Sequence, residues 1–592
     1  MSTLVSSRIC QALVFSFAST FAIIGWTIFC PFFTIDDSDV LRRATDYLAQ
    51  HGWMAYLKAY VPEDLVQRRY WPGYAVYILF RTHLMGLSSI GWHTMNVLLY
   101  VAIGTMLSWL SFKACKSYWP GLIAYIITLT AGVFDYQTTW FSYVFVNSFE
   151  PYMALVWLIG AVVYVGMLQA TGRSCWWLAA AVVVVLGYSV TIKENAFLVV
   201  GSAAVLMLVH SFLPGGNRAA IRCTGGALLL MAGGWGALVY SLTPRDAGYA
   251  GTSSLVTSAV ELFKNFARYA RLIYQASGPF VLIGLLLGVL RISLTRRHYR
   301  VYLFTTVLCL AQIGSLCIWP TISLRLIYPA FLGLLFVASM EFYQMWKLAE
   351  SAHGRKPLFV FGGAVALLMM VASLAHSNVA HILMLTAIVL LAGTVLIHAS
   401  NMRALCTARG AFAGCVLFLG LGLVVTGVSH VTSYPAIYKS TELTRHLVVR
   451  KASEHCPPQA RLIWFINPGQ EIFPYSSDIH ARLFFDRDDL ESIPASHFLE
   501  QGATLRQGDM IVMYGDYYKH KPEGDFQHFQ ITQGSYISPI LNHGDFLTAL
   551  RDNFWSNRDQ SVSTKLLRRY YEGTINAYLL REAQWEIPVD WR

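Results

Sequence analysis

The chain has 592 residues, of which 55% are hydrophobic and only 13% are charged, and its mean hydropathy is +0.48. Soluble domains carry roughly 25% charged residues, so this composition excludes an ordinary soluble protein and indicates a membrane protein. The net charge of +11 comes from cations scattered over many short connections. It forms no single basic stripe with aromatics, which argues against nucleic acid as a partner.

Apolar runs of about 18–22 residues recur almost to Val431, and each is long enough to cross ~30 Å of hydrocarbon. They predict about thirteen membrane-spanning helices. The expected spans are 9–33, 92–112, 118–134, 151–169, 176–192, 196–213, 225–243, 279–294, 301–319, 326–346, 358–376, 380–399 and 410–430. The predicted fold class is a mainly α-helical, polytopic membrane domain over residues 1–430, followed by an α/β domain over residues 431–592.

Lysine and arginine fall mostly in alternate short connections between these spans, with few acids beside them. The positive-inside rule places such connections in the cytoplasm. The opposite, external side then holds the loop 34–91, the turn at Lys193, the loop 243–278, Arg325 and the C-terminal domain. That arrangement needs an odd number of crossings, and the predicted number is odd.

The first apolar run ends in Asp36 and Asp37, which puts two carboxylates at a membrane–water interface. Ionisable groups at that depth are costly and are usually retained for a function. One carboxylate can remove the proton of an acceptor hydroxyl as a general base. The second can orient the first or help to hold a divalent cation near a phosphate. The alternative is structural, since Asp favours helix N-caps and a helix is expected from near Val40.

The loop 34–91 is too polar for a membrane span. Its apolar positions from Val40 to Val61 recur at helical spacing, which predicts amphipathic helices lying in the interface. The aromatic residues of the loop, Tyr74 and Tyr77 among them, fit a belt at the level of the lipid headgroups.

Arg69, Tyr70 and Trp71 belong to the same loop and add a cation and flat aromatic faces near the acidic pair. Aromatic faces suit stacking against a sugar ring. The interfacial belt explains these residues nearly as well.

Lys193, Glu194 and Asn195 form the whole turn between two predicted spans. The ammonium and the carboxylate can contact a phosphate and sugar hydroxyls. They can equally neutralise each other in a simple hairpin, and an exposed pair of that kind contributes little to stability. A later external loop, 243–278, carries a second amphipathic pattern from Ser253 to Tyr274.

Arg325 stands at the external mouth of a late span, in the segment Arg325-Leu326-Ile327-Tyr328-Pro329. Short external connections of this chain otherwise avoid cations. A guanidinium can bind a phosphate bidentately and stabilise the charge that develops on it. The alternative is an arginine that reaches up to the lipid headgroups.

The C-terminal domain, at about 160 residues, is large enough to have its own core. Short apolar runs at 461–466 and 509–514 predict strands, and 495–500 and 545–553 look helical. The acidic run 486–489 is interpreted as a solvated turn and not as a metal site. No role is assigned to the external histidines, His430, His446, His455 and His480.

The order of these features resembles the GT-C superfamily of integral-membrane glycosyltransferases. The run His93-x-x-Asn96-x-Leu98-Leu99 looks like the start of the second span in relatives of protein O-mannosyltransferases, and the segment 325–329 is similar to an Arg-Tyr-Leu-Tyr-Pro-like segment of that group. Lipid A aminoarabinose transferases share the architecture. The chain departs from the pattern after the Lys193-Glu194 turn, and its tail matches no domain of the group, so sugar and acceptor stay open.

The resemblance implies a polyprenyl-phosphate-linked sugar donor, inverting transfer, and an acid after the first span as general base, here Asp36 or Asp37. It places Arg325 and Lys193 on the donor phosphate. The remaining expected cavity and acceptor residues are Glu194, Arg69, Tyr70, Trp71 and Tyr328. No cofactor is implied beyond a divalent cation at the two acids, which stays open.

The function expected from the sequence is transfer of a sugar to a glycan, lipid or protein at the periplasmic face of a bacterial inner membrane. A lipid-borne donor explains why no nucleotide-binding glycine-rich loop is present. An O-antigen polymerase or ligase is the nearest enzymatic alternative. A transporter or flippase of lipid-linked sugars is the alternative of another class, and almost no charged residues are expected within the spans to support it. A non-catalytic scaffold that presents the C-terminal domain is a third alternative.

Overall fold

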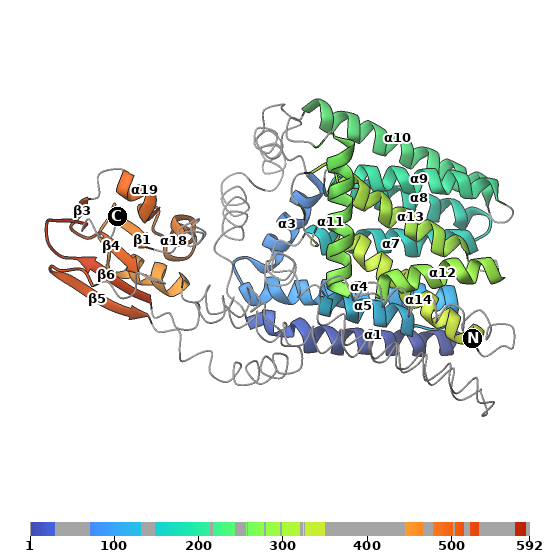
Figure 1. Ribbon diagram of the computed structural model, residues 1–592, viewed down its shortest axis with the longest axis horizontal. Coiled ribbons are helices and arrows are strands. Elements are labelled where there is room, and N and C mark those ends of the chain that lie inside the picture. The colour runs from blue at the N-terminus through green and yellow to red at the C-terminus, as the bar shows by residue number, and fades with distance from the viewer. Residues whose placement is uncertain are drawn as a thin grey trace.

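The computed structural model describes residues 2–29, 52, 72–131, 149–193, 195–213, 217–242, 256, 258–277, 280–295, 299–319, 322, 324, 326–349, 445–465, 477–500, 504–513, 521–531 and 575–587. These residues form a bundle of long helices followed by a small α/β unit (Figure 1). The N-terminus lies at the end of the bundle away from that unit.

The long helices fall where the apolar runs predict them, and every predicted span before residue 350 corresponds to one. They are α1 (Ser2–Ile24, continued by the 3₁₀ helix η1, Gly25–Phe29), α4 (Ser89–Cys115), α5 (Trp119–Ala131), α7 (Phe149–Gln169), α8 (Arg173–Ser189), α9 (Ala196–Phe212), α10 (Arg218–Leu242), α12 (Phe280–Thr295), α13 (Tyr299–Leu316) and α14 (Tyr328–Ala349). The predicted spans 358–376, 380–399 and 410–430 lie outside the described residues.

Helix α14 is central to the packing. It contacts α5, α12 and α13, and most of its side chains are buried. The main apolar cluster joins it to α1, α4, α5 and α12, while a second cluster lies among α7, α8, α9 and α10. Because α14 starts at Tyr328, the segment predicted to bind phosphate is attached to the most enclosed helix of the bundle.

The outer surface of the bundle is apolar. Phe212 on α9 is 72% exposed, Leu230 on α10 is 79% exposed and Val184 on α8 is 68% exposed. Soluble monomers rarely expose contiguous apolar surface on this scale, so hydrocarbon is the medium that fits it. Among the described helices, α4 and α7 are long and apolar enough to cross a membrane by length and composition, and shorter apolar helices accompany them. The predicted class, a polytopic helical membrane protein with an α/β tail, is confirmed.

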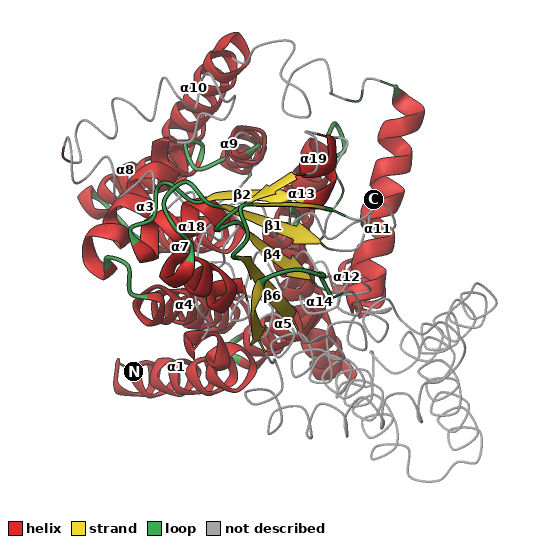
Figure 2. Ribbon diagram, turned by 90° about the vertical axis from the view of Figure 1, so that its left-hand side faces the viewer, coloured by secondary structure: helices red, strands yellow, loops and turns green. Residues whose placement is uncertain are grey.

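Two more helices, α3 (Pro72–Met85) and α11 (Ala259–Ser277), lie at the end of the bundle that faces the α/β unit (Figure 2). Helix α11 confirms the amphipathic pattern predicted from Ser253 to Tyr274. The aromatic residues of helix α3 were predicted to form a belt at the lipid headgroups, and this prediction is wrong for Tyr74. Tyr74 is only 1% exposed and stacks on Phe149, so it lies inside the protein and not in a headgroup belt.

The α/β unit is built on a five-stranded sheet with the order β2-β1-β4-β6-β5. Its strands are β1 (Arg461–Phe465), β2 (Glu491–Pro494), β4 (Met510–Met513), β5 (Phe526–Ile531) and β6 (Ile575–Leu580). Strand β1 pairs in parallel with β2 and β4, and β6 pairs antiparallel with β4 and β5. A separate antiparallel pair joins β3 (Thr504–Arg506) to β7 (Gln584–Glu586).

The central strands explain why the predicted apolar runs fold as they do. Leu462 and Trp464 of β1 enter one apolar cluster, and Ile463 and Phe465 enter the cluster on the opposite face. Side chains alternate across a strand, so a continuous apolar run is buried on both faces. Strands β1 and β4 confirm the predicted strands, and α19 (Ala495–Glu500) confirms the predicted helix. The predicted helix 545–553 lies outside the described residues.

The spans were expected to contain almost no charged residues, but two spanning helices of the bundle share a buried ion pair. Arg291 of α12 donates from Nε to Oε2 of Glu341 at 2.5 Å and from Nη2 to Oε1 at 2.7 Å. Their side chains are 5% and 2% exposed. Single charges on two apolar helices did not reveal this pair in the sequence, because its members are far apart in the chain.

Candidate functional site

The structure describes two of the predicted site residues, Lys193 and Tyr328. The others, Asp36, Asp37, Arg69, Tyr70, Trp71, Glu194 and Arg325, lie outside the described residues, as does the expected amphipathic stretch from Val40 to Val61. Among the described residues, no group of three or more His, Cys, Asp or Glu side chains is placed to hold a metal ion. The site is therefore built from the neighbours of Lys193 and Tyr328.

Lys193 is buried in the turn between α8 and α9, where its Nζ lies 2.6 Å from Oε1 of Glu150. The lysine is 7% exposed and the glutamate 1% exposed. Glu150 lies in the first turn of α7, and a helix N-terminus favours a negative charge. Lys193 therefore has a carboxylate partner contributed by another helix, which the simple-hairpin interpretation did not foresee.

Glu150 is the residue that the sequence analysis missed. Its signal was a lone acid directly before the apolar run 151–169. Its partner lies 43 residues away in the chain, so no local pattern connects them.

Asn195 follows in the same turn and is 3% exposed. Neither its Nδ2 nor its Oδ1 has a hydrogen-bond partner in the part of the chain that the structure describes. A buried carboxamide normally has partners, and leaving one unsatisfied costs about 1–3 kcal/mol. An unsatisfied amide beside a buried ammonium is a feature that a polar ligand would explain.

Helix α3 is docked directly onto this turn. The amide of Gly73 donates to the Thr191 carbonyl at 3.0 Å, and the Tyr188 hydroxyl donates to the Gly73 carbonyl at 2.6 Å. A Cβ atom at position 73 would collide with Oγ1 of Thr191, so only glycine permits this approach. The residues that precede α3 in the chain are Arg69, Tyr70 and Trp71.

Aromatic side chains surround the pair. Tyr74 stacks on Phe149 and Tyr77 stacks on Tyr152, each with 3.8 Å between ring centroids. The Tyr152 hydroxyl lies 2.9 Å from that of Tyr188. These stacked rings exclude water from the base of the turn, which strengthens the attraction between Lys193 and Glu150.

A buried cation on α3 packs next to these stacked aromatic side chains. Arg81 is fully buried, donates to the Tyr77 hydroxyl at 2.9 Å and to the Trp92 carbonyl at 2.6 Å, and lies 4.5 Å from the Trp92 ring centroid. It fixes α3 against the start of α4.

Tyr328 occupies the neighbouring apolar cluster at the start of α14. It is 1% exposed, and its ring meets that of Tyr100 edge-on at 6.4 Å. Its hydroxyl has no hydrogen-bond partner among the described residues. Tyr152 of α7 packs against both the cluster that contains Tyr328 and the cluster around Tyr74. Helix α7 thus connects the two described parts of the site, while their convergence with Arg325 stays a prediction.

The α/β unit meets the bundle beside this layer. Leu483 and Phe484 of α18 (Ser477–Phe485) pack against the cluster that contains Tyr74 and Met153. This contact places the tail on the same side of the bundle as the Lys193 turn, as the sequence predicts (Figure 1).

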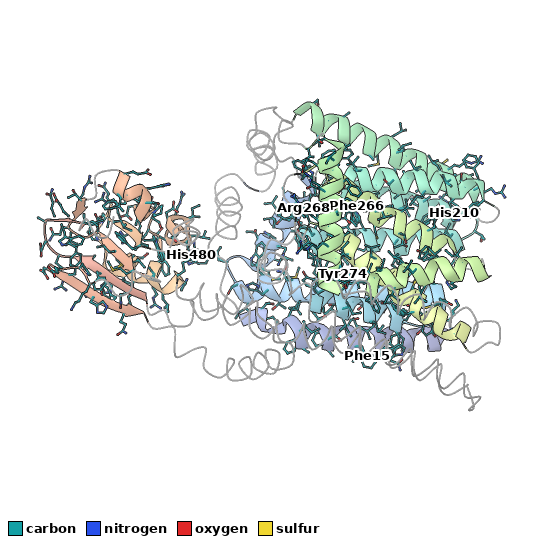
Figure 3. The ribbon with its side chains drawn as sticks, viewed as in Figure 1. Phe15, His210, Phe266, Arg268, Tyr274 and His480 are labelled. Carbon is teal, nitrogen blue, oxygen red and sulfur yellow. The ribbon has the colours of Figure 1, made fainter. Side chains whose placement is uncertain are left out.

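The tail also holds a histidine pair at this helix. Nδ1 of His446 lies 2.9 Å from Nε2 of His480, which is labelled in Figure 3. Burial lowers the pKa of both imidazoles, and for His480 the neighbouring His446 and Arg445 lower the pKa further. Sequence spacing did not reveal the pair, because its members lie 34 residues apart.

The acidic run 486–489 is a structural turn, in agreement with the sequence interpretation. Arg487 binds Asp489 at 2.7 Å and also donates to the carbonyls of Ser453, Cys456 and Pro457. The guanidinium lowers the pKa of Asp489 to about 2.

No protein-family model matches the chain, and no curated protein matches it. The solved structures that resemble it include crystal structures of ArnT from Cupriavidus metallidurans, one bound to undecaprenyl phosphate and one in the apo state. Each aligns with a TM-score of 0.44 and 13% identity, over 90% of this chain and 96% of the ArnT chain. That overlap is too loose to establish a common fold.

Proposed function

We propose that this chain is an integral-membrane glycosyltransferase of the GT-C type. It moves a sugar from a polyprenyl-phosphate donor to an acceptor hydroxyl at the periplasmic face of a bacterial inner membrane. The observation that carries the proposal is the buried Lys193–Glu150 pair, at the end of an apolar bundle where the tail is docked. Beside it lies the Asn195 amide, which has no hydrogen-bond partner among the described residues. These groups suit a ligand that combines a phosphate with sugar hydroxyls.

The proposed reaction is one inverting displacement. Asp36 or Asp37 takes the proton from the acceptor hydroxyl as its oxygen attacks the anomeric carbon of the donor. The bond between that carbon and the phosphate oxygen breaks, and polyprenyl phosphate leaves with the electron pair. A divalent cation, held by the same two acids, would supply further neutralisation of the phosphate.

Lys193 and Arg325 are assigned to the phosphate. Glu150 holds the ammonium in place before the donor arrives, so the lysine has a fixed position and no rearrangement is needed when the phosphate binds. The lysine has three donor hydrogens, and among the described residues its hydrogen-bond partner is Glu150. The two donors that have no partner among these residues are assigned to phosphate oxygens.

The acceptor side is assigned to Glu194, Arg69, Tyr70, Trp71 and Tyr328. The contact of α18 with the bundle supports entry of the acceptor between the tail and the external loops. The acceptor class, whether glycan, lipid or protein, follows from none of these contacts.

The Arg291–Glu341 pair is the observation that favours the alternative of another class, a transporter or flippase, because intramembrane charges often line translocation paths. Both groups are paired bidentately and enclosed by protein, which suits a fixed link between helices better. An oligosaccharide polymerase or ligase would share the donor and face but depend less on an acidic base.

The test is transfer in lipid nanodiscs with an undecaprenyl-phosphate-linked sugar, followed by mass spectrometry of the product. Asp36→Asn and Asp37→Asn should insert and purify normally, and removal of the base should lower turnover by roughly 10²–10⁴-fold. Unchanged product from both single variants and from the double variant would overturn the base assignment. Movement of a fluorescent lipid-linked sugar across vesicles without product formation would favour the flippase.

A further inference from the structure

Helix α11 has an unusual place in the molecule. It runs across the ends of α9, α10 and α12 (Figure 1). A helix that crosses the ends of membrane spans lies close to the membrane plane. Its composition is amphipathic, unlike that of the spanning helices around it.

The helix surface divides into three lengthwise sectors. One is buried against the bundle and contains Asn265, Tyr269, Ile273 and Ala276. Residues of a helix advance by about 100° each, which places Val260, Phe263 and Ala270 together on a second, exposed apolar sector. Lys264, Arg268 and Arg271 follow on the third sector, which is exposed and basic. Figure 3 labels Phe266, Arg268 and Tyr274 along this helix.

The buried sector holds α11 firmly. Asn265 donates from Nδ2 to the Cys317 carbonyl at 2.9 Å, a group that the end of α13 would otherwise leave unpaired. Tyr269 is fully buried in the same cluster as Tyr328. The orientation of the two exposed sectors is therefore fixed by the fold.

The second sector of α11 exposes large apolar side chains, as the outer surface of the bundle does. Phe263 is 72% exposed and Val260 63% exposed. Helix α12 packs on α11 and follows it in the chain, and its exposed apolar residues Leu282, Leu286 and Val289 lie along one helix face. Exposed apolar residues are thus found both on α11 and on the spanning helix that follows it.

The basic sector has one charge that is already neutralised. Lys264 forms an exposed pair with Glu261 at 2.6 Å. Arg268 donates to the neutral side chain of Asn265 at 3.2 Å, and its attraction to Glu261 is weaker than that of Lys264. With Arg271, it makes a row of two cations beside the apolar sector.

We propose that α11 is a membrane-docking helix of the external leaflet. Its sector of Val260, Phe263 and Ala270 lies among acyl chains, and Arg268 and Arg271 bind the phosphates of anionic lipid headgroups. The helix also fixes the carbonyl of Cys317, a few residues before Arg325, so it ties the leaflet to the predicted phosphate-binding segment. That last consequence rests on the proposed function, whereas the lipid contact does not.

The test uses the full chain in nanodiscs, with a keto amino acid that carries a nitroxide, so that the ten cysteines stay in place. Labels go to two pairs of chain neighbours, Phe263 with Lys264 and Ala270 with Arg271. Electron paramagnetic resonance then measures access of oxygen, which concentrates in hydrocarbon, and of a water-soluble nickel chelate. We expect a several-fold higher ratio of oxygen to nickel access at Phe263 and Ala270 than at their neighbours.

Each other outcome contradicts the docking. Low access of both reagents at Phe263 and Ala270 would mean that protein covers this sector. Equal nickel access within each pair would mean that water covers it. Neither measurement depends on transferase activity, so failure of the docking and failure of the proposed function are distinguishable.

The headgroup assignment is tested with spin-labelled phosphatidylglycerol and phosphatidylcholine. We expect Arg268→Gln and Arg271→Gln each to lower the preference for the anionic lipid by about five-fold. Lys264→Gln is the matched control and should change it less, because Glu261 already neutralises that lysine. Unchanged selectivity in the Arg268→Gln/Arg271→Gln double variant would overturn the phosphate contact.

Discussion

Two buried ion pairs among the described residues of the bundle differ in how completely they are satisfied. Arg291 and Glu341 share two hydrogen bonds between α12 and α14, so each carboxylate oxygen has a donor. Lys193 and Glu150 share one, at the end of the bundle, next to an amide that has no partner among the described residues. We call the first pair closed, because both oxygens of Glu341 have a donor, and the second open, because Lys193 uses one of its three donors among the described residues.

This difference separates a structural pair from a candidate binding site. Burying two charges is costly, and that cost is recovered only when the remaining donors and acceptors are also paired. The carboxylate of the closed pair meets that condition within the protein. The open pair meets it when a ligand contributes oxygens, which is the reason for assigning Lys193 to a phosphate.

The largest effect on stability is expected from opening the closed pair. Glu341→Leu leaves the Arg291 guanidinium buried without its carboxylate, which should cost about 3–5 kcal/mol and lower the thermal midpoint measured in detergent. The double variant Arg291→Met/Glu341→Leu removes both charges and should recover most of that loss. A single variant as stable as the double one would contradict the description of the pair as closed.

Lys193→Met should weaken binding of undecaprenyl phosphate by roughly 10–100-fold, since a charge-assisted hydrogen bond contributes about 1.5–3 kcal/mol. Its effect on stability should be smaller than that of Glu341→Leu, because Glu150 can take up a proton once its partner is gone. The measurement is the rise in thermal midpoint on adding the lipid. The control is Lys347→Met, an exposed lysine on α14.

Glu150→Gln sharpens the same comparison. It keeps the side-chain shape but removes the charge that holds the ammonium in place, so lipid-phosphate affinity should fall by less than in Lys193→Met, and stability should fall as well. Loss of affinity equal to that of Lys193→Met would mean that the two residues act only as a structural unit.

The sequence predicted the helices well because membrane insertion depends on local hydropathy. It predicted β1 and β4 for a similar reason, since a short, continuous apolar run suits a strand buried on both faces. The sequence could not predict which charged residues pair with each other. Glu150 and Lys193 are 43 residues apart, and Arg291 and Glu341 are 50 residues apart, so only the fold pairs them.

The aromatic residues of α3 show a second limit of prediction from sequence. Tyrosines near a membrane interface suit both a headgroup belt and a packed protein layer, and composition does not separate the two. Tyr74 and Tyr77 proved to belong to the packed layer, because Gly73 lets α3 approach the turn at Thr191.

The close approach of α3 to the turn at Thr191 requires glycine at position 73. Gly73→Ala places a methyl group against Oγ1 of Thr191, and overpacking of this kind costs about 1–3 kcal/mol. Because α3 carries the chain that follows Trp71, transferase activity should fall along with the thermal midpoint. Gly226→Ala in α10 is the control, since a Cβ there meets nothing within 4 Å. Equal behaviour of the two variants would remove α3 from the support of the site.

The smallest effect is expected at the histidine pair, a buried contact between two bases with no carboxylate between them. The pKa of His480 is lowered in the folded tail, whereas in the unfolded chain it is near 6.5. Below that pH the unfolded tail binds more protons than the folded one, so stability falls as the pH drops from 7 toward 5. Arg445 and Arg450 lie close to the pair and make protonation still less favourable.

Hydrogen exchange of residues 445–465 in the full chain measures this dependence. The exchange rate divided by the intrinsic rate, which itself falls as the pH drops, should rise between pH 7 and pH 5, by up to ~1.4 kcal/mol of lost stability for each unit by which the pKa is lowered. His480→Gln should flatten the dependence, while His455→Gln, on a half-exposed histidine, should leave it unchanged. A slope that survives His480→Gln would assign the acid sensitivity to other groups, and the contact of Leu483 and Phe484 with the bundle would then be independent of the imidazoles.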